Sequence, residues 1–155
     1  MDASVLTRIK ILTGLSDAHL HSFLQYMEIL SLETGSYAVR QGEESDALYL
    51  ILEGELRARV CVDGQETILA TLNAGGFFGE ISLLDQGPRS ADVVANERST
   101  LLKFSAAAYA KLRREAPALA EPFLYALSQT IVGRFRLLTK RYQDSVLMLQ
   151  TLQET

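Results

Sequence analysis

Short segments with apolar residues, each bounded by turn residues, fill the middle of this 155-residue chain. Gly35, Gly42 and Gly54 lie between segments, and the residues before Asp63-Gly64 alternate between apolar and polar, which is typical of a two-residue hairpin turn. Many short strands at close spacing favour a barrel or jelly roll of about eight strands. The predicted strands are Glu28–Leu32, Tyr37–Arg40, Ala47–Leu52, Glu55–Val62, Gln65–Leu72, Asp92–Ala95 and Thr100–Phe104.

Helical patterns flank these strands. Ser16 is a candidate N-cap for a helix over residues 17–27, in which apolar residues recur at helical spacing. Ser105 is a candidate N-cap for a second helix over 106–115, which Pro117 should end. The sequence therefore predicts a mainly β fold with flanking helices: one before the roll and the rest after it.

The last part of the chain has the pattern of a long helix. It is expected to begin near Pro122, because proline is tolerated in a first helical turn. Gly133 interrupts the pattern, which indicates either a hinge or a close contact between helix and barrel. The sequence thus predicts one domain in two parts: a β-roll with its N-terminal helix over 1–120, and the C-terminal helix over 121–155.

The net charge and the counts of cysteine and histidine exclude several classes of function. The net charge of −4 does not suggest nucleic-acid binding by this chain. No apolar run reaches the length of a membrane helix, and the N-terminus lacks the pattern of an export signal. Cys61 stands alone, so we expect no internal disulfide and a reducing, cytoplasmic setting. The only histidines, His19 and His21, lie outside the strands, so we expect no metal site and no catalytic centre.

A carboxylate and a guanidinium stand out in the irregular segment after the fifth predicted strand. Residues 79–84 can form one short helical turn, whose first N–H groups have no internal partners and attract anions. Gly79 allows close approach, Arg89 offers a fork of donors for phosphate, and Ser90 adds a hydroxyl. Glu80 accepts hydrogen bonds and suits a ligand hydroxyl. The alternative is that Glu80 and Arg89 form an ion pair that bridges a loop.

The stretch FGEISLLDQGPRSADVVA resembles the phosphate-binding cassette of the cyclic nucleotide-binding domain family, the sensor of catabolite-activator-type regulators, cyclic-nucleotide-dependent kinases and gated channels. LTGLSDAHLHSFLQYM resembles the opening helix of that family, and GSYAVRQGEESDALYLILEGELRARV resembles its glycine-marked strands. The resemblance implies that Glu80 accepts the ribose 2′-hydroxyl and that Arg89 grips the cyclic phosphate. It also implies phosphate contacts from the backbone amides of Gly79, Ile81 and Ser82 and from the Ser90 hydroxyl.

The sequence says less about which base the nucleotide carries than about its phosphate and ribose. The Ser90 hydroxyl suits cAMP, by similarity to the bacterial regulators, and cGMP stays the alternative. In the family the helix after the barrel closes over the base as a lid. By that resemblance Leu138 and Thr139 lie near the purine, and the hinge lies near Gly133.

The same helix offers a surface for association. Ile131, Phe135, Leu138, Tyr142, Leu149 and Leu152 follow a spacing close to that of a coiled coil. They predict either a homodimer or packing of this face on the chain's own barrel. A basic flank formed by Arg134, Arg136, Lys140 and Arg141 is either solvated or contacts a partner or an anionic ligand.

Three functions fit this sequence. The first is a cyclic nucleotide receptor that regulates an unknown downstream protein. The second is the sensor of an activator-type transcription regulator whose DNA-binding module is absent, because the residues after Ser145 are too few for a helix-turn-helix. The third is a structural scaffold that binds no ligand, against which the presence of both Glu80 and Arg89 argues.

Overall fold

The computed structural model describes residues 3–153, which form two four-stranded sheets, a two-stranded pair and several flanking helices. The elements are, in chain order, the 3₁₀ helices η1 (Ala3–Arg8) and η2 (Lys10–Leu12), α1 (Asp17–Leu24), β1 (Glu28–Leu32), β2 (Tyr37–Val39), β3 (Glu44–Ser45), β4 (Ala47–Glu53), β5 (Glu55–Val62), β6 (Gln65–Asn73), β7 (Phe77–Phe78), α2 (Glu80–Leu84), β8 (Gly87–Pro88), β9 (Asp92–Ala95), β10 (Ser99–Ser105), α3 (Ala106–Glu115) and α4 (Pro117–Gln153). The prediction of a mainly β fold with flanking helices is confirmed.

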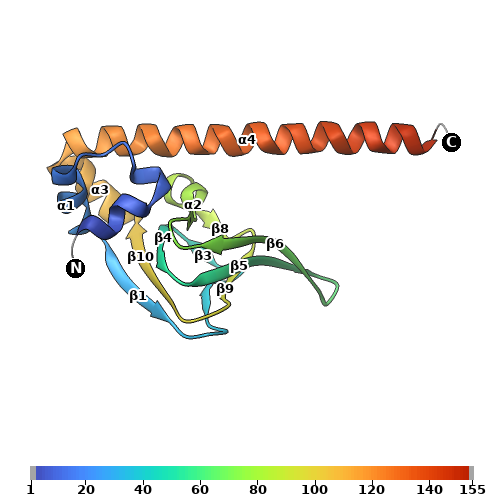
Figure 1. Cartoon of the computed structure of the whole chain (residues 1–155), viewed down its shortest axis with the longest axis horizontal. Helices are drawn as coiled ribbons and strands as arrows, with labels where there is room; N and C mark the ends of the chain where they lie inside the picture. The colour runs from blue at the N-terminus through green and yellow to red at the C-terminus, as the bar shows by residue number, and fades with distance from the viewer. Residues whose placement is uncertain (1–2, 154–155) are drawn as a thin grey trace.

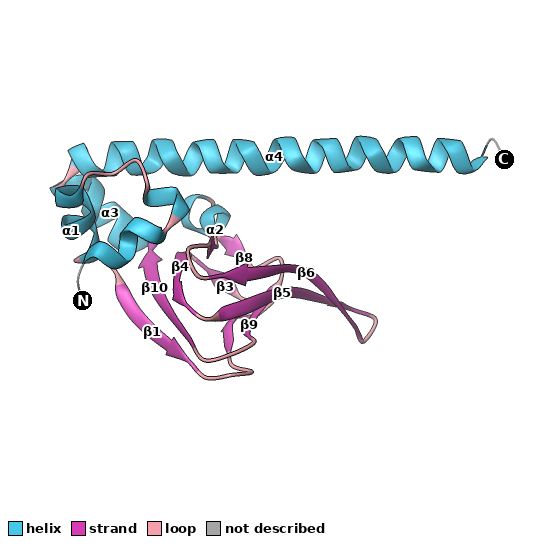
Figure 2. Ribbon diagram, viewed as in Figure 1, coloured by secondary structure: helices cyan, strands magenta, loops and turns pink. Residues whose placement is uncertain are grey.

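The strands form two four-stranded antiparallel sheets and one short pair. One sheet has the order β1-β10-β4-β7, the other has the order β2-β9-β5-β6, and β3 pairs with β8. The helices η1, η2, α1 and α3 gather beside one end of the roll, where α4 also begins (Figure 1). From there α4 runs past α2 and extends well beyond the roll (Figure 2). This arrangement places α2 between the sheets and α4.

Two apolar cores hold these layers together. The first lies between the helices and the sheet β1-β10-β4-β7, and the rings of Phe23, Phe104 and Phe123 meet at its centre. The Phe23 centroid lies 5.0 Å from that of Phe104 and 4.8 Å from that of Phe123. The second core lies inside the roll and includes Leu56 and Leu101. Because Phe123 belongs to α4, the first turns of that helix are part of the fold's core.

The hairpin of β5 and β6 projects from the roll and turns at the predicted dipeptide. Asp63 and Gly64 have φ values of 52° and 77°, and Val62 pairs with Gln65 across them. Positive φ at both central residues is the requirement of a type I′ turn. The predicted two-residue hairpin is therefore confirmed.

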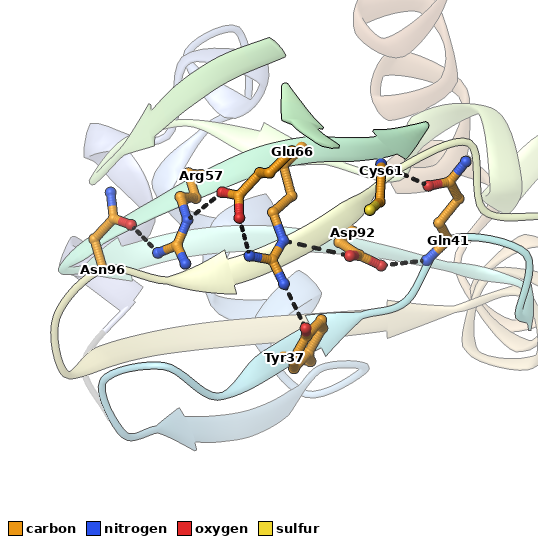
Figure 3. A network of polar contacts seen from close by, with 8 residues as sticks. Tyr37, Gln41, Arg57, Cys61, Glu66, Asp92 and Asn96 are labelled. Carbon is orange, nitrogen blue, oxygen red and sulfur yellow. Dashed lines mark hydrogen bonds and ion pairs between the residues drawn. The ribbon is translucent and has the colours of Figure 1, made fainter. Parts of the chain in front are cut away.

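A polar network covers the outer face of the sheet β2-β9-β5-β6 (Figure 3). Arg59 forms ion pairs with Glu66 at 2.6 Å and with Asp92 at 3.4 Å, and it donates a hydrogen bond to the hydroxyl of Tyr37. Arg57 lies 3.5 Å from the same Glu66 carboxylate. These polar side chains link all four strands across the outer face of the sheet. The inner face of the sheet carries the apolar side chains of the second core.

Three strands were not predicted from the sequence pattern. The two-residue strands β3, β7 and β8 are too short to show alternation, and each exists only because a partner lies beside it. β7 pairs with β4 through Phe78 and Tyr49, whose rings stack with centroids 4.9 Å apart. The β4–β7 pair lies next to α2, and the β3–β8 pair lies next to Arg89, so both pairs shape the candidate site.

The N-terminal region differs from the prediction. The 3₁₀ helices η1 and η2 were not predicted, and their apolar residues are buried in the first core. Ser16 caps α1 as predicted, accepting from the N–H of His19. The helix ends at Leu24 instead of residue 27, because i→i−3 hydrogen bonds tighten the chain before β1 begins at Glu28.

The predicted start of the last helix was wrong. Ser105 caps α3 as expected, but Pro117 opens α4 instead of only ending α3. Proline fits the first helical position because its missing N–H would have no partner there. Pro122 consequently lies inside the helix, and the division expected at residue 120 falls within α4. The break between α3 and α4 is the single residue Ala116.

Gly133 shows neither of the expected features in this structure. α4 continues unbroken through it, as Figure 1 shows, and a Cβ added at this position would meet nothing within 4 Å. The glycine therefore reflects no close contact and no break here. Within residues 3–153, no helix is both long enough and apolar enough to cross a membrane.

Candidate ligand-binding site

Gly79 places the short helix α2 against the roll. It is the N-cap of α2 and has φ 87° and ψ 16°, a left-handed conformation that glycine adopts without strain. A Cβ at this position would overlap the carbonyl oxygen of Ala47 and the guanidinium of Arg89. Only glycine therefore lets the cassette backbone approach β4 and Arg89 this closely.

The first turn of α2 presents free amide groups. Its first internal donor is the N–H of Leu83, which bonds to the carbonyl of Gly79 at 3.2 Å. The N–H groups of Glu80, Ile81 and Ser82 precede it and so have no acceptor inside the helix. The predicted helical turn over 79–84 is confirmed, and its amides form an anion-attracting end.

Arg89 is a buried cation at this end of α2. It is only 6% exposed, and its Nη2 donates to the Ser45 hydroxyl at 2.6 Å and to the Ala47 carbonyl at 2.7 Å. Its Nε is buried and has no hydrogen-bond partner among the described residues. Burial lowers the pKa of the Arg89 guanidinium, because water is withheld from the charged form. The site thus holds a positive charge with unused donors.

Glu80 is a buried anion with a partner from another element. It is 5% exposed, and its Oε1 accepts a hydrogen bond from Nη1 of Arg134 on α4. Arg134 also donates to the Phe77 carbonyl at 3.4 Å and lies 4.7 Å from the centroid of the Phe77 ring. No ion pair joins Glu80 to Arg89 among residues 3–153. The alternative of a loop-bridging Glu80–Arg89 pair is therefore wrong.

Sequence reasoning missed the role of Arg134. The residue was expected only as part of a basic flank on the last helix, either solvated or in contact with a partner or ligand. Nothing in the local pattern distinguishes it from Arg136 or Lys140, which are both exposed. Only the path of α4 across α2 decides which of these cations meets Glu80.

The remaining predicted residues lie at different depths. Ser82 is buried, whereas Ile81 and Ser90 are exposed. Leu138 lies one helical turn beyond Arg134 and is exposed, and the Thr139 hydroxyl donates to the Phe135 carbonyl at 3.0 Å. In the part of the chain described, no hydrogen bond joins Leu138 or Thr139 to α2 or Arg89. The structure therefore brings the cassette residues together and leaves these two outside.

The arrangement suits a small anion that also carries a hydroxyl group. Arg89 and the amides of α2 offer donors, and Glu80 offers an acceptor in the same turn. Residues 3–153 contain no group of His, Cys, Asp and Glu side chains that could hold a metal ion.

Comparison with known proteins agrees with this geometry. Residues 29–116 match the model of the cyclic nucleotide-binding domain, a regulatory ligand-binding domain and not a catalytic one. The cyclic AMP receptor protein of Thermus thermophilus is 36% identical over 119 residues, which cover 76% of this chain and 55% of that protein. A cGMP-dependent protein kinase of Caenorhabditis elegans is 32% identical over 92 residues, which cover 58% of this chain and 12% of that protein.

A solved structure shows the same fold. The N-terminal domain of a transcriptional regulator from Streptomyces coelicolor matches with a TM-score of 0.77 and 26% identity, over 86% of this chain and 94% of that one. The chain spans about half the length of the Thermus relative and much less of the kinase. The family match covers more than half of the chain and includes the whole cassette. This chain therefore belongs to the cyclic nucleotide-binding domain family.

Proposed function

We propose that this chain is a receptor for a cyclic nucleotide, with cAMP preferred over cGMP, that regulates a partner through the position of α4. One observation carries the proposal. The buried Arg89 guanidinium lies beside Gly79, the N-cap of α2, and has an unused Nε donor, and Glu80 belongs to the first turn of that helix. Buried charges without partners are costly, which indicates that an anion completes this site.

Each cassette residue then has a role. Arg89 binds the exocyclic oxygens of the cyclic phosphate, and the amides of Gly79, Ile81 and Ser82 donate to the same oxygens. Ser90 is exposed and free to add its hydroxyl. Glu80 accepts the ribose 2′-hydroxyl. A cyclic nucleotide is the ligand class that offers an anionic phosphate and a ribose hydroxyl within one small rigid ring system.

Arg134 supplies the link to α4. It is the ion-pair partner of Glu80, the group that the ribose must reach. The ribose hydroxyl therefore shares or displaces this guanidinium, and binding changes the contact between α2 and α4. Gly133 lies directly before Arg134, where a change in helix direction would occur at little steric cost. Leu138 and Thr139 close over the base in this proposal.

The preference for cAMP rests on Ser90 and on the similarity to bacterial regulators. The relatives include proteins named for cAMP and proteins named for cGMP, so both nucleotides belong in the first experiment. The reducing cytoplasmic setting expected from the single Cys61 is part of the same proposal.

A second candidate function is the sensor part of a longer transcription regulator. The match to the N-terminal domain of the Streptomyces regulator, which covers 94% of that domain's chain, supports it. In either case the downstream partner responds to a change in α4. Both functions require the same ligand-binding step, so a single titration experiment tests them together.

Calorimetric titration with cAMP and cGMP tests the proposal. The wild-type chain should bind one of them with micromolar or higher affinity. Arg89→Ala should lose about 2–5 kcal/mol, roughly 30-fold to a few thousand-fold in affinity, because the charge-assisted contacts to phosphate disappear. Arg89→Lys should also weaken binding, because one ammonium cannot reproduce the guanidinium fork.

Arg98→Ala is the matched control. Arg98 is an exposed arginine paired with Glu33, outside the cassette, so its removal should leave affinity unchanged. No binding of either nucleotide by the wild-type chain would overturn the proposal and favour the scaffold. Unchanged affinity in Arg89→Ala would overturn the phosphate role of Arg89.

A further inference from the structure

Arg89 is held in place by contacts within the protein. Its Nη2 donates two hydrogen bonds, one to the Ala47 carbonyl and one to the Ser45 hydroxyl at 2.6 Å. The carbonyl belongs to the main chain of β4. Ser45 therefore holds the guanidinium through its side-chain hydroxyl, and the centroid of the Tyr49 ring lies 5.6 Å from Cζ of the same guanidinium.

The position of Ser45 is itself well defined. Ser45 lies on β3 opposite Gly87 of β8, the strand that ends directly before Arg89. The N–H of Arg89 also donates to the Glu43 carbonyl at 2.9 Å, and its carbonyl accepts from Gly42 at 2.8 Å. Residues 42–45 thus hold both ends of the arginine: the backbone of Gly42 and Glu43 holds its main chain, and the Ser45 hydroxyl holds its guanidinium.

The hydrogen bonds that orient the Arg89 guanidinium are of a kind that suits a phosphate receptor. Both acceptors of Nη2 are neutral, so they orient the guanidinium without cancelling its charge. They also leave the buried Nε donor unused. A carboxylate in the place of Ser45 would form an ion pair with Arg89 and compete with an anionic ligand. A hydroxyl avoids this competition and still restricts the rotamers of a long side chain.

We propose that Ser45 is a positioning residue for ligand recognition, whose hydroxyl preorganises Arg89 for the phosphate of the ligand. The inference rests on the proposed function for its ligand, but the contact between Ser45 and Arg89 lies within the protein and can be measured without a ligand. Ser45 acts through Arg89, so its effect on affinity must vanish when Arg89 is absent.

A double-mutant cycle measures this dependence. The probe is cAMP, or cGMP where that nucleotide binds better, titrated into the full chain. Ser45→Ala should weaken binding roughly 5- to 30-fold, because the guanidinium loses a charge-assisted hydrogen bond and must be ordered by the ligand. Ser45→Thr keeps the hydroxyl and should stay within about 3-fold of wild type. In the Arg89→Ala background, Ser45→Ala should change affinity less than about 2-fold.

A measurement without ligand separates this inference from the proposed function. In the ¹⁵N-labelled unliganded chain, the Nε–H resonance of Arg89 should be sharp in wild type and Ser45→Thr. In Ser45→Ala it should broaden or exchange faster with water, because the guanidinium is no longer held. Thermal unfolding of each variant checks that the fold is intact.

The inference is overturned if Ser45→Ala binds like wild type, or if it weakens binding equally in the presence and absence of Arg89. If the wild-type chain binds neither nucleotide, the proposed function fails. The Arg89 resonance then still decides whether Ser45 holds the guanidinium: an unchanged resonance in Ser45→Ala overturns the positioning role.

Discussion

Two buried charged residues belong to the candidate site, and their partners differ: Glu80 lies in the first turn of α2, and Arg89 directly follows β8. Glu80 is paired with a cation from α4, whereas Arg89 donates hydrogen bonds to two neutral acceptors, the Ser45 hydroxyl and the Ala47 carbonyl. A paired buried carboxylate is tolerated in the fold, since its charge is compensated. In the proposed function, the buried guanidinium binds an external anion, and this difference is what makes the turn a candidate binding site.

The Glu80–Arg134 pair gives a stability prediction. Arg134→Gln should destabilise the chain by about 1–3 kcal/mol, because it leaves a buried carboxylate without its counter-charge. The loss should not reach the upper values for buried pairs, because the Arg134 side chain is 44% exposed. Urea unfolding measures the free energy directly.

Adding Glu80→Gln tests whether the two residues act as a pair. The double variant should be about 0.5–3 kcal/mol more stable than the sum of the single effects predicts, because it removes the charge together with its partner. Arg136→Gln, on the exposed side of the same helix, is the control and should change stability little. Strictly additive effects would contradict the pairing.

At the scale of elements, a tyrosine joins the segment after α1 to the last residue of α3. The hydroxyl of Tyr26, which follows α1, donates to the Glu115 carboxylate of α3 at 2.9 Å. This hydrogen bond, together with burial and the charge of Glu115, raises the pKa of Tyr26 above its usual 10.0. The protonated phenol is the form that can donate, so folding favours it.

The raised pKa of Tyr26 predicts a loss of stability in alkali. A group whose pKa is higher in the folded than in the unfolded state stabilises the fold. This stabilisation is complete at pH values below the unfolded pKa, which is near 10.0 for tyrosine. That contribution is lost as the pH rises through the folded value. Between about pH 9 and pH 11, wild type should therefore lose more stability than Tyr26→Phe. Tyr125→Phe, at an exposed tyrosine of α4, should behave like wild type. Urea unfolding across this pH range measures the difference, and parallel losses in wild type and Tyr26→Phe would refute the linkage.

At the scale of the whole molecule, α4 belongs to the core at one end and projects from the roll at the other. Phe123 and Leu127 are fully buried, and Ile131 packs partly against the same core. Beyond Ile131, the remaining apolar residues with coiled-coil spacing form what we call the apolar seam. Their exposed fractions lie between 61% and 71%, for Phe135, Leu138, Tyr142, Leu149 and Leu152. The expectation that this face packs on the chain's own barrel is therefore wrong past Ile131. These exposed apolar side chains support the proposal that two copies of the chain pair through α4.

A substitution far from the ligand site tests the homodimer. Sedimentation velocity at tens of micromolar chain should show a dimer for wild type and a monomer for Leu149→Glu, because a buried charge opposes helix pairing. Gln150→Glu adds the same charge beside the seam and should stay dimeric. A monomeric wild type, or a dimer that survives Leu149→Glu, would refute association through this face.

Much of the fold could be predicted from short-range patterns. The strands over 28–32 and 55–62 were predicted at the positions where they lie, because bounding turn residues and, for 55–62, alternation before the Asp63-Gly64 turn are local properties. Ser16 and Ser105 were recognised as N-caps for the same reason. The cassette residues Gly79, Glu80 and Arg89 could be named because their chemistry is compact in sequence.

Contacts between residues far apart in the chain depended on the tertiary structure. Glu80 meets Arg134, and Arg89 meets Ser45, across separations of 54 and 44 residues. The short strand pairs and the position of Pro122 inside α4 likewise depend on neighbours from other elements. Hydrophobic periodicity and capping act within a few residues, so the sequence determined the elements and the chemistry they carry. The partner of each buried charge depends on how those elements pack, and no local pattern encodes it.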